Sequence, residues 1–307
     1  MKSLLQHLME SSRTQRTEEY DPYHLNDITI QMIYRKAREN SNRYKPYFKD
    51  KNLYDLFDNK LYSFGELFSD KTGARGRHHN FLGGLFVHTF EMLDILWETY
   101  VKHPERCEEF LSQNKKRELK KSGEKFDPET VDFGIAATAI LYHDWGKLEE
   151  YDHEAGPDEK GMYGIAYGML SHGHIVLSFS EFRQDAKKWH VTPFIAEKVE
   201  HCILAHHSKL DWGSPVKPIT IEAHLVCNCD LISSKQASGK SNYFYDFLNG
   251  NVKIGDEKEL YDEKIKPWMD SERMVDNMHK SERKVRDRLR DMSYRNKEDM
   301  ENNYGNA

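Results

Sequence analysis

The sequence is short of the features that mark secreted and membrane proteins. Its 307 residues contain only four cysteines, Cys107, Cys202, Cys227 and Cys229, which are too few and too irregularly spaced for a disulfide framework. No stretch reaches the roughly 18 consecutive apolar residues of a membrane span. The N-terminus has neither a long apolar segment nor a small-residue cleavage site. We therefore expect reduced thiols, a cytoplasmic location and no membrane partner.

An excess of positive charge is also missing. The formal net charge is −6, which argues against non-specific binding of nucleic acid over the whole surface. One cluster of lysine and arginine lies between residues 115 and 125. We interpret this cluster first as an exposed helix face, with contact to a phosphate backbone as the alternative.

Apolar residues recur at helical spacing along much of the chain, and no pattern indicates paired strands. We predict an all-α bundle with buried helices over residues 81–101, 127–143, 174–189, 193–206 and 219–235. Thr192 is expected to be an N-cap, with Pro193 at the first helical position. The composition suggests a helical N-terminal extension (1–70), a central domain (71–240) and a charged helical tail (241–307) with a disordered end.

Histidine is plentiful, with 16 residues, and several of these lie beside apolar runs. The heptapeptide L-Y-H-D-W-G-K, from Leu141 to Lys147, follows a strongly apolar segment. A buried carboxylate such as Asp144 must be paired or bound to a metal. One buried histidine is more often a hydrogen-bonded core residue, but a metal centre between facing helices explains a whole set. The set is His88, His143, Asp144, His174, His206, His207 and Asp230.

The ordered pattern H…HD…D resembles the HD-domain superfamily of metal-dependent phosphohydrolases. It is carried by His88, His143, Asp144 and Asp230, and Lys147 follows as it often does in that superfamily. The segments G-G-L-F-V-H-T, G-H-I, H-H-S-K-L-D-W-G-S-P and I-E-A-H-L look like those of YhaM-type bacterial 3′-to-5′ exoribonucleases, across about residues 76–236. The resemblance implies an HD-domain helical bundle, here with helical N- and C-terminal extensions.

The resemblance also implies a pair of divalent metal ions. One would take His88, His143, Asp144 and Asp230. Asp144 would bridge to a second ion held by His174 and His206, with His207 as a further candidate. Imidazole and carboxylate ligands suit manganese, iron, cobalt, nickel or magnesium, and manganese is our expectation. The implied reaction is hydrolysis of a phosphodiester by metal-activated hydroxide.

Other residues are candidates for catalysis and substrate binding. Asp144 and Lys147 are the expected catalytic residues; Lys147 would contact a phosphoryl oxygen, unless it is a solvated lysine at a helix end. A loop before the first ligand helix and a segment after the double histidine are expected to contact substrate, unless they are ordinary surface. The candidates there are Arg77, His78, His79, Lys209 and Ser214.

The substrate is left open between several classes. We expect a 3′-to-5′ exonuclease acting on single-stranded nucleic acid or an oligonucleotide. The related exoribonucleases carry an N-terminal OB-fold, whereas residues 1–70 here look helical and too short for one. A nucleotide or cyclic-nucleotide phosphohydrolase is therefore the main alternative. An HD-fold di-iron oxygenase and a non-catalytic docking module are two further alternatives.

Overall fold

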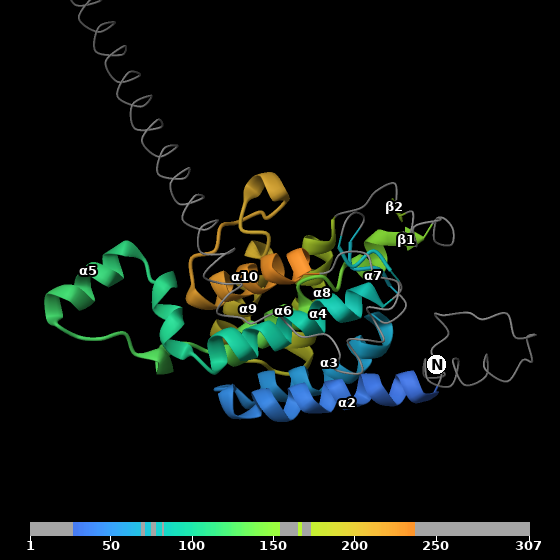
Figure 1. Ribbon diagram of the computed structural model, residues 1–307, viewed down its shortest axis with the longest axis horizontal. Helices are drawn as coiled ribbons and strands as arrows, with labels where there is room; N and C mark the ends of the chain where they lie inside the picture. The colour runs from blue at the N-terminus through green and yellow to red at the C-terminus, as the bar shows by residue number, and fades with distance from the viewer. Residues whose placement is uncertain are drawn as a thin grey trace, which may run out of the picture. The chain divides into compact units, whose positions relative to one another are not determined.

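The computed structural model describes residues 27–68, 71–74, 78–81, 83–153, 165–167 and 173–236. The regular structure in these ranges is helical apart from one short pair of strands, so the all-α prediction is confirmed (Figure 1). The predicted C-terminal tail and residues 1–26 of the predicted N-terminal extension lie outside the described residues. The domain boundaries therefore stay predictions.

Two helices near the N-terminus pack against the centre of the fold. α2 (Asp27–Tyr44) leads through η1 (Lys45–Tyr47) into α3 (Lys51–Phe68), and the two helices lie side by side. α3 contacts α6 (Phe133–Tyr142), where the Phe64 ring lies 5.0 Å from that of Tyr142. From α2, Lys36 and Arg43 form ion pairs with Asp94 of α4 (Gly84–Ile95). These helices thus share a core with α4 and α6.

The core is centred on two helices that are buried all round. α4 (Gly84–Ile95) continues into a π-helical segment, η2 (Leu96–Val101), and α6 runs from Phe133 to Tyr142. Every residue of α4 and of α6 is buried. The prediction of one buried face over residues 81–101 is therefore wrong for α4. Helices α3, α6 and α10 (Ile221–Gln236) enclose it, and ion pairs compensate its polar residues.

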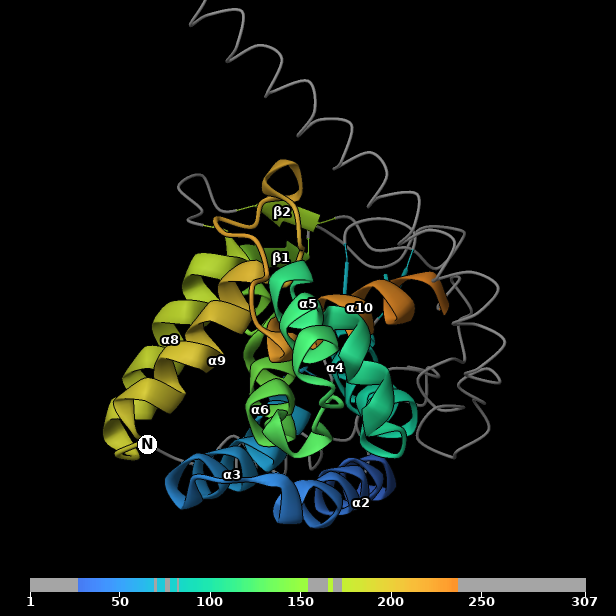
Figure 2. The ribbon, with the colours of Figure 1, turned by 90° about the vertical axis from the view of Figure 1, so that its left-hand side faces the viewer.

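Three helices from the second half complete the bundle. α8 (His174–Lys188), α9 (Pro193–Ala205) and α10 (Ile221–Gln236) surround α6, and α10 also packs on α4 (Figure 2). Thr192 is the N-cap of α9, as predicted, but its hydroxyl does not cap the helix. It donates instead to Asp50, at the start of α3, and so joins two helix ends.

The connections contain the rest of the regular structure. η3 (Pro104–Phe110), the exposed α5 (Gln113–Ser122) and η4 (Pro128–Thr130) link η2 to α6. α6 begins at residue 133 rather than at the expected 127, because Asp132 caps it by accepting from the Ile135 N–H. After α6 come α7 (Lys147–Glu150), then β1 (Tyr151–His153) and β2 (Ile165–Tyr167), which pair antiparallel. η5 (Leu210–Trp212) lies between α9 and α10.

Two predictions from composition can be checked against this fold. The four cysteines are free and buried, as expected. Among the described residues, no helix is long and apolar enough to cross a membrane.

Candidate metal centre

Helix ends meet at the centre of the bundle and bring the predicted residues together. His143 is the C-cap of α6, with Asp144 next to it; His174 is the first residue of α8, and His206 is the C-cap of α9. His88 and Asp230 come from within α4 and α10. Gly146 permits this approach, because a Cβ there would lie 2.2 Å from the His174 carbonyl oxygen.

The first cluster consists of His88, His143, Asp144 and Asp230. His88 Nε2 lies 3.2 Å from His143 Nε2 and 3.3 Å from Asp230 Oδ1. His143 Nε2 lies 3.2 Å from Asp144 Oδ2, and His88 Nε2 lies 3.6 Å from the same oxygen. His88, His143 and Asp144 therefore direct ligand atoms within 4.8 Å of one another at one small, buried space, and Asp230 adjoins this group through His88.

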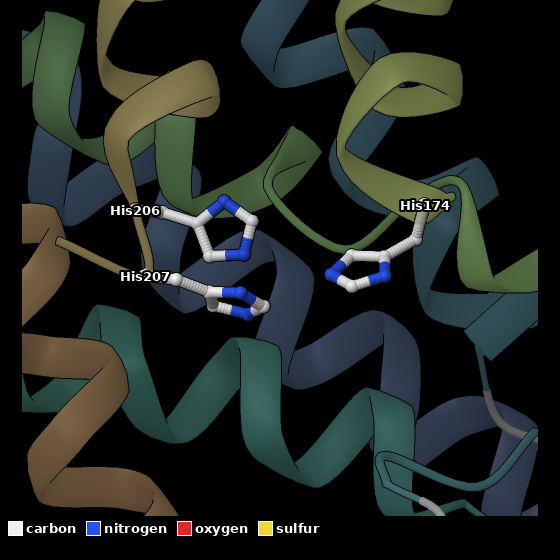
Figure 3. Close-up of side chains that lie close together, drawn as sticks. All are labelled: His174, His206 and His207. Atoms are coloured by element: carbon white, nitrogen blue, oxygen red, sulfur yellow. The ribbon is translucent and has the colours of Figure 1, made fainter. Parts of the chain in front are cut away.

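The second cluster consists of His174, His206 and His207, whose nearest ring nitrogens lie within 4.8 Å of one another. Figure 3 shows His174 approaching from α8 and the other two from the end of α9, with the three rings facing a common space. His206 is fully buried, while His174 and His207 are partly exposed. This cluster is the more accessible of the two.

Asp144 lies between the clusters and offers one oxygen to each. Its Oδ2 faces His88 and His143, while its Oδ1 lies 3.5 Å from His174 Nε2 and 3.8 Å from His206 Nε2. Asp144 Oδ1, His174 Nε2 and His206 Nε2 are all buried and have no hydrogen-bond partner among the described residues. Buried polar atoms without partners are unfavourable, so three such atoms facing one another indicate a site for a ligand.

The other ring nitrogen of each histidine is committed to an oxygen acceptor. His143, His206 and His207 donate through Nδ1–H to the carbonyl oxygens of Ile140, Ile203 and Trp212, respectively. His174 Nδ1 lies 2.8 Å from the Glu150 carboxylate. Such partners fix the tautomer, so that Nε2 carries the lone pair that a metal ion requires.

His88 is held by a longer chain of hydrogen bonds. Its Nδ1 lies 2.9 Å from Ser233 Oγ, and Ser233 donates to Glu91 Oε2 over 2.6 Å. Because the serine proton is directed at Glu91, Ser233 accepts from His88 Nδ1–H. Glu91 is fully buried and also accepts from His79 Nε2 at 3.2 Å. The lone pair of His88 Nε2 therefore faces the first cluster.

A divalent cation fits this arrangement. Nitrogen and oxygen ligands lie ~2.1 Å from such ions, which places neighbouring donors ~3.0 Å apart in octahedral geometry and ~3.4 Å apart in tetrahedral geometry. The donor separations of 3.2 Å, 3.3 Å and 3.6 Å in the first cluster fall around these values. Two facing lone pairs on these Nε2 atoms, 3.2 Å apart, would repel each other, so either a proton on one ring or a cation between the rings has to occupy this space.

The charges of the site are strongly coupled. Burial would raise the pKa of Asp144, but His143 and Lys147 outweigh this and hold it well below its usual range. Burial lowers the pKa of His88 to about 4, and it also lowers the pKa of His206. For His143, the Asp144 carboxylate outweighs burial, so the pKa is raised. Without an ion, a proton on His143 thus adds to the counter-charge that Lys147 provides for Asp144.

Lys147 is buried, so the alternative of a solvated lysine at a helix end does not hold. Its Nζ donates to Asp144 Oδ2 and to the carbonyl oxygen of Gly73, each over 2.6 Å. The attraction of Asp144 raises the pKa of Lys147 despite burial. A permanent positive charge therefore lies against the central carboxylate.

The predicted substrate-binding residues fall into different environments. His79 is fully buried against Glu91 and supports His88 from behind, while the His78 ring lies 6.2 Å from that of His88. Ser214 is also buried, and its hydroxyl accepts from the His207 N–H instead of lining a cleft. Lys209 lies over the Trp212 ring, with Nζ 4.4 Å from its centroid. Arg77 lies outside the described residues.

Three supporting residues were not predicted from the sequence. Glu91 and Ser233 follow His88 and Asp230 by three positions, a spacing that places them on the same helix face and that could have identified them. Glu150 follows Lys147 by three positions in the same way. The Gly73 carbonyl, by contrast, leaves no signal in a side-chain pattern.

Comparisons with known proteins agree with this geometry. The sequence model of the HD domain family matches residues 86–235. Relatives named 3′-5′ exoribonuclease YhaM include those of Bacillus licheniformis (26% identical over 187 residues, 61% of this chain and 50% of the relative) and Oceanobacillus iheyensis (29% over 162 residues, 53% and 41%). That of Bacillus subtilis is 25% identical over 168 residues (55% and 44%).

These matches have a defined extent. The chain spans about half the length of the curated relatives it matches. No solved structure matches it. The matched region contains both clusters, from His88 in α4 to Asp230 in α10. Residues 86–235 of this chain are therefore an HD domain.

Proposed function

We propose that the two clusters hold two divalent cations and that the protein hydrolyses phosphodiester bonds in single-stranded nucleic acid from the 3′ end. One observation carries the proposal. Five histidines commit Nδ1 to an oxygen atom and direct Nε2 toward the space on either side of Asp144. A hydrogen-bonded core does not require five histidines in the same tautomer around one carboxylate.

In this proposal each cluster holds one cation and Asp144 contributes an oxygen to both. When bound, such a pair of cations lowers the pKa of a water molecule and takes up charge on phosphoryl oxygens. Manganese is the ion we propose, and the imidazole and carboxylate donors are also compatible with iron, cobalt, nickel and magnesium. Because the cysteines are neutral, buried thiols whose pKa is raised by burial, they do not add soft ligands.

The chain's own residues position the reacting groups and balance their charge. In the hydrolysis, a water oxygen bonds to phosphorus, the bond from phosphorus to the O3′ atom of the preceding nucleotide breaks, and that oxygen takes up a proton. We assign two roles to Lys147: it keeps Asp144 ionised, and it offsets negative charge that builds up on the phosphoryl group. The second cluster, being partly exposed, is where the phosphodiester would enter.

The choice of substrate rests on the relatives, whose names describe 3′-5′ exoribonucleases. The experiment uses 5′-labelled single-stranded RNA and metal-free protein to which Mn²⁺ is added. We expect a ladder of products that shorten from the 3′ end. His88→Ala is expected to abolish it, whereas His103→Ala, at an exposed histidine outside the clusters, should have no effect.

Further assays of the same protein, with DNA, a panel of nucleotides and iron, define the results that would contradict the proposal. Intact RNA and DNA, together with release of inorganic phosphate from a panel of nucleotides, would identify a nucleotide phosphohydrolase instead. Oxygen consumption by iron-loaded protein without any hydrolysis would identify an oxygenase.

A further inference from the structure

The loop between α9 and α10 presents unusual side chains next to the second cluster. Its short helix η5 projects beyond α10 in both views and is drawn in gold (Figures 1 and 2). Leu210 and Trp212 are 59% and 47% exposed, respectively, and Lys209 lies over the Trp212 ring. The loop therefore offers water a large aromatic surface with a positive charge on it.

Hydrogen bonds fix this loop to the candidate metal centre. The Trp212 carbonyl oxygen accepts from His207 Nδ1 over 2.7 Å, and Ser214 Oγ accepts from the His207 N–H over 3.0 Å. Gly213, which follows the tryptophan, has φ of +98°, a conformation that glycine adopts without strain. The Trp212 backbone is thus one hydrogen bond from a ring whose other nitrogen belongs to the second cluster.

We propose that Trp212, with Lys209, forms a stacking platform for a nucleobase that flanks the cleaved phosphate. The proposal rests on the function proposed above and names a substrate contact for it. An indole ring stacks on any base, and an ammonium group attracts the adjacent phosphates, so the pair suits a single strand without selecting its sequence. The hydrogen bond to His207 fixes the Trp212 backbone next to the second cluster, so a base on the indole would lie near the phosphate.

Helix α9, whose C-cap is His206, provides a matched control at its N-terminal end. Phe194 is 65% exposed, and Lys198 Nζ lies 5.0 Å from its ring centroid. This pair has the same chemistry, but it begins α9, whereas His206 caps the other end, ~18 Å away along the axis. Loss of a general aromatic or cationic surface would therefore affect both pairs, and loss of a base contact at the centre would affect only Trp212.

The test uses the full chain with Mn²⁺ and two RNA strands, one normal and one with abasic residues at the last two 3′ positions. For Trp212→Ala we expect kcat/KM to fall about 5- to 150-fold on the normal strand and less than about twofold on the abasic strand. Trp212→Phe should retain most of the activity, and Phe194→Ala should match the wild type. Fluorescence anisotropy of the labelled strands with chelator-treated protein gives a second measure of the base contact.

An equal loss on both strands would show that Trp212 only supports the loop, and no loss on either strand would exclude the contact; both results overturn the inference. Wild-type protein that cleaves neither strand would instead refute the proposed function. In that case, the anisotropy still decides the inference: equal binding of normal RNA by wild type and Trp212→Ala overturns it.

Discussion

The two clusters are supported in different ways. In the first cluster, the His88 side chain is 2% exposed and belongs to α4, a helix that is buried all round. Hydrogen bonds from His88 to Ser233 and from Ser233 to Glu91 fix the orientation of its ring. In the second, His174 begins a helix after Gly173, which has φ of +78°, and its side chain is 16% exposed. The first cluster thus contains residues from within helices, His88 and Asp230, whereas all three histidines of the second cluster come from helix ends. We expect the first to bind its ion more tightly and the second to meet the substrate.

Removal of Asp144 should abolish this difference, because Asp144 contributes to both clusters. For Asp144→Ala we predict loss of at least one bound metal ion and of all hydrolysis, with the helical circular dichroism largely retained. Metal analysis of purified wild-type and variant protein tests this. A variant that keeps two ions per chain would show that the carboxylate does not join the clusters.

Single histidine variants should separate the clusters. His88→Ala removes the buried partner of Asp230 and one of the two partners of Ser233, so we expect loss of the first ion and a fall of about 1–3 kcal/mol in the free energy of unfolding of metal-free protein. His174→Ala should remove the second ion with little change in that free energy. Metal stoichiometry and urea unfolding in chelator measure both effects. Equal losses of unfolding free energy in His88→Ala and His174→Ala would contradict the idea that the core supports the first cluster more than the second.

The supporting carboxylates offer a finer comparison. Glu91→Gln removes the charge behind His88, and Glu150→Gln removes the charge behind His174. Loss of such a partner typically weakens metal affinity about 10- to 100-fold. We expect the first variant to weaken the tighter site and the second to weaken the looser one, in titrations of metal-free protein. Glu105→Gln, at a 69% exposed position, is the control that should change neither.

The sequence predicts the candidate ligands better than the residues that support them. Ligand candidates such as His88 and Asp144 stand out because a polar residue beside an apolar run on a helix needs a reason. Their supports are harder to find, because the partner of Glu91 depends on how α4 and α10 pack. The burial of α4 on all sides depends on α3 and on the ion pairs from α2, which contact it from elsewhere in the chain. The hydroxyl of Thr192 likewise bonds Asp50, which no local pattern indicates.

The pH dependence of metal affinity should show the smallest difference between the clusters, but it tests the charges of their histidines directly. The pKa of His143 is raised by Asp144, so in metal-free protein below that pKa a cation must displace a proton from the first cluster. The pKa values of His206 and His207 are lowered by burial, so these rings are already neutral near pH 7. Below the raised pKa of His143, the affinity of the first cluster should fall about tenfold for each unit of acidification.

Burial lowers the pKa values of His206 and His207, so protonation of these two rings should weaken the second cluster only at more acidic pH. Titration calorimetry in buffers of different ionisation enthalpy measures the protons released by each ion. We expect the first ion to release more protons than the second at pH 6. Equal proton release by both ions would mean that Asp144 does not hold a proton on His143. The charge coupling inferred between these two residues would then be wrong.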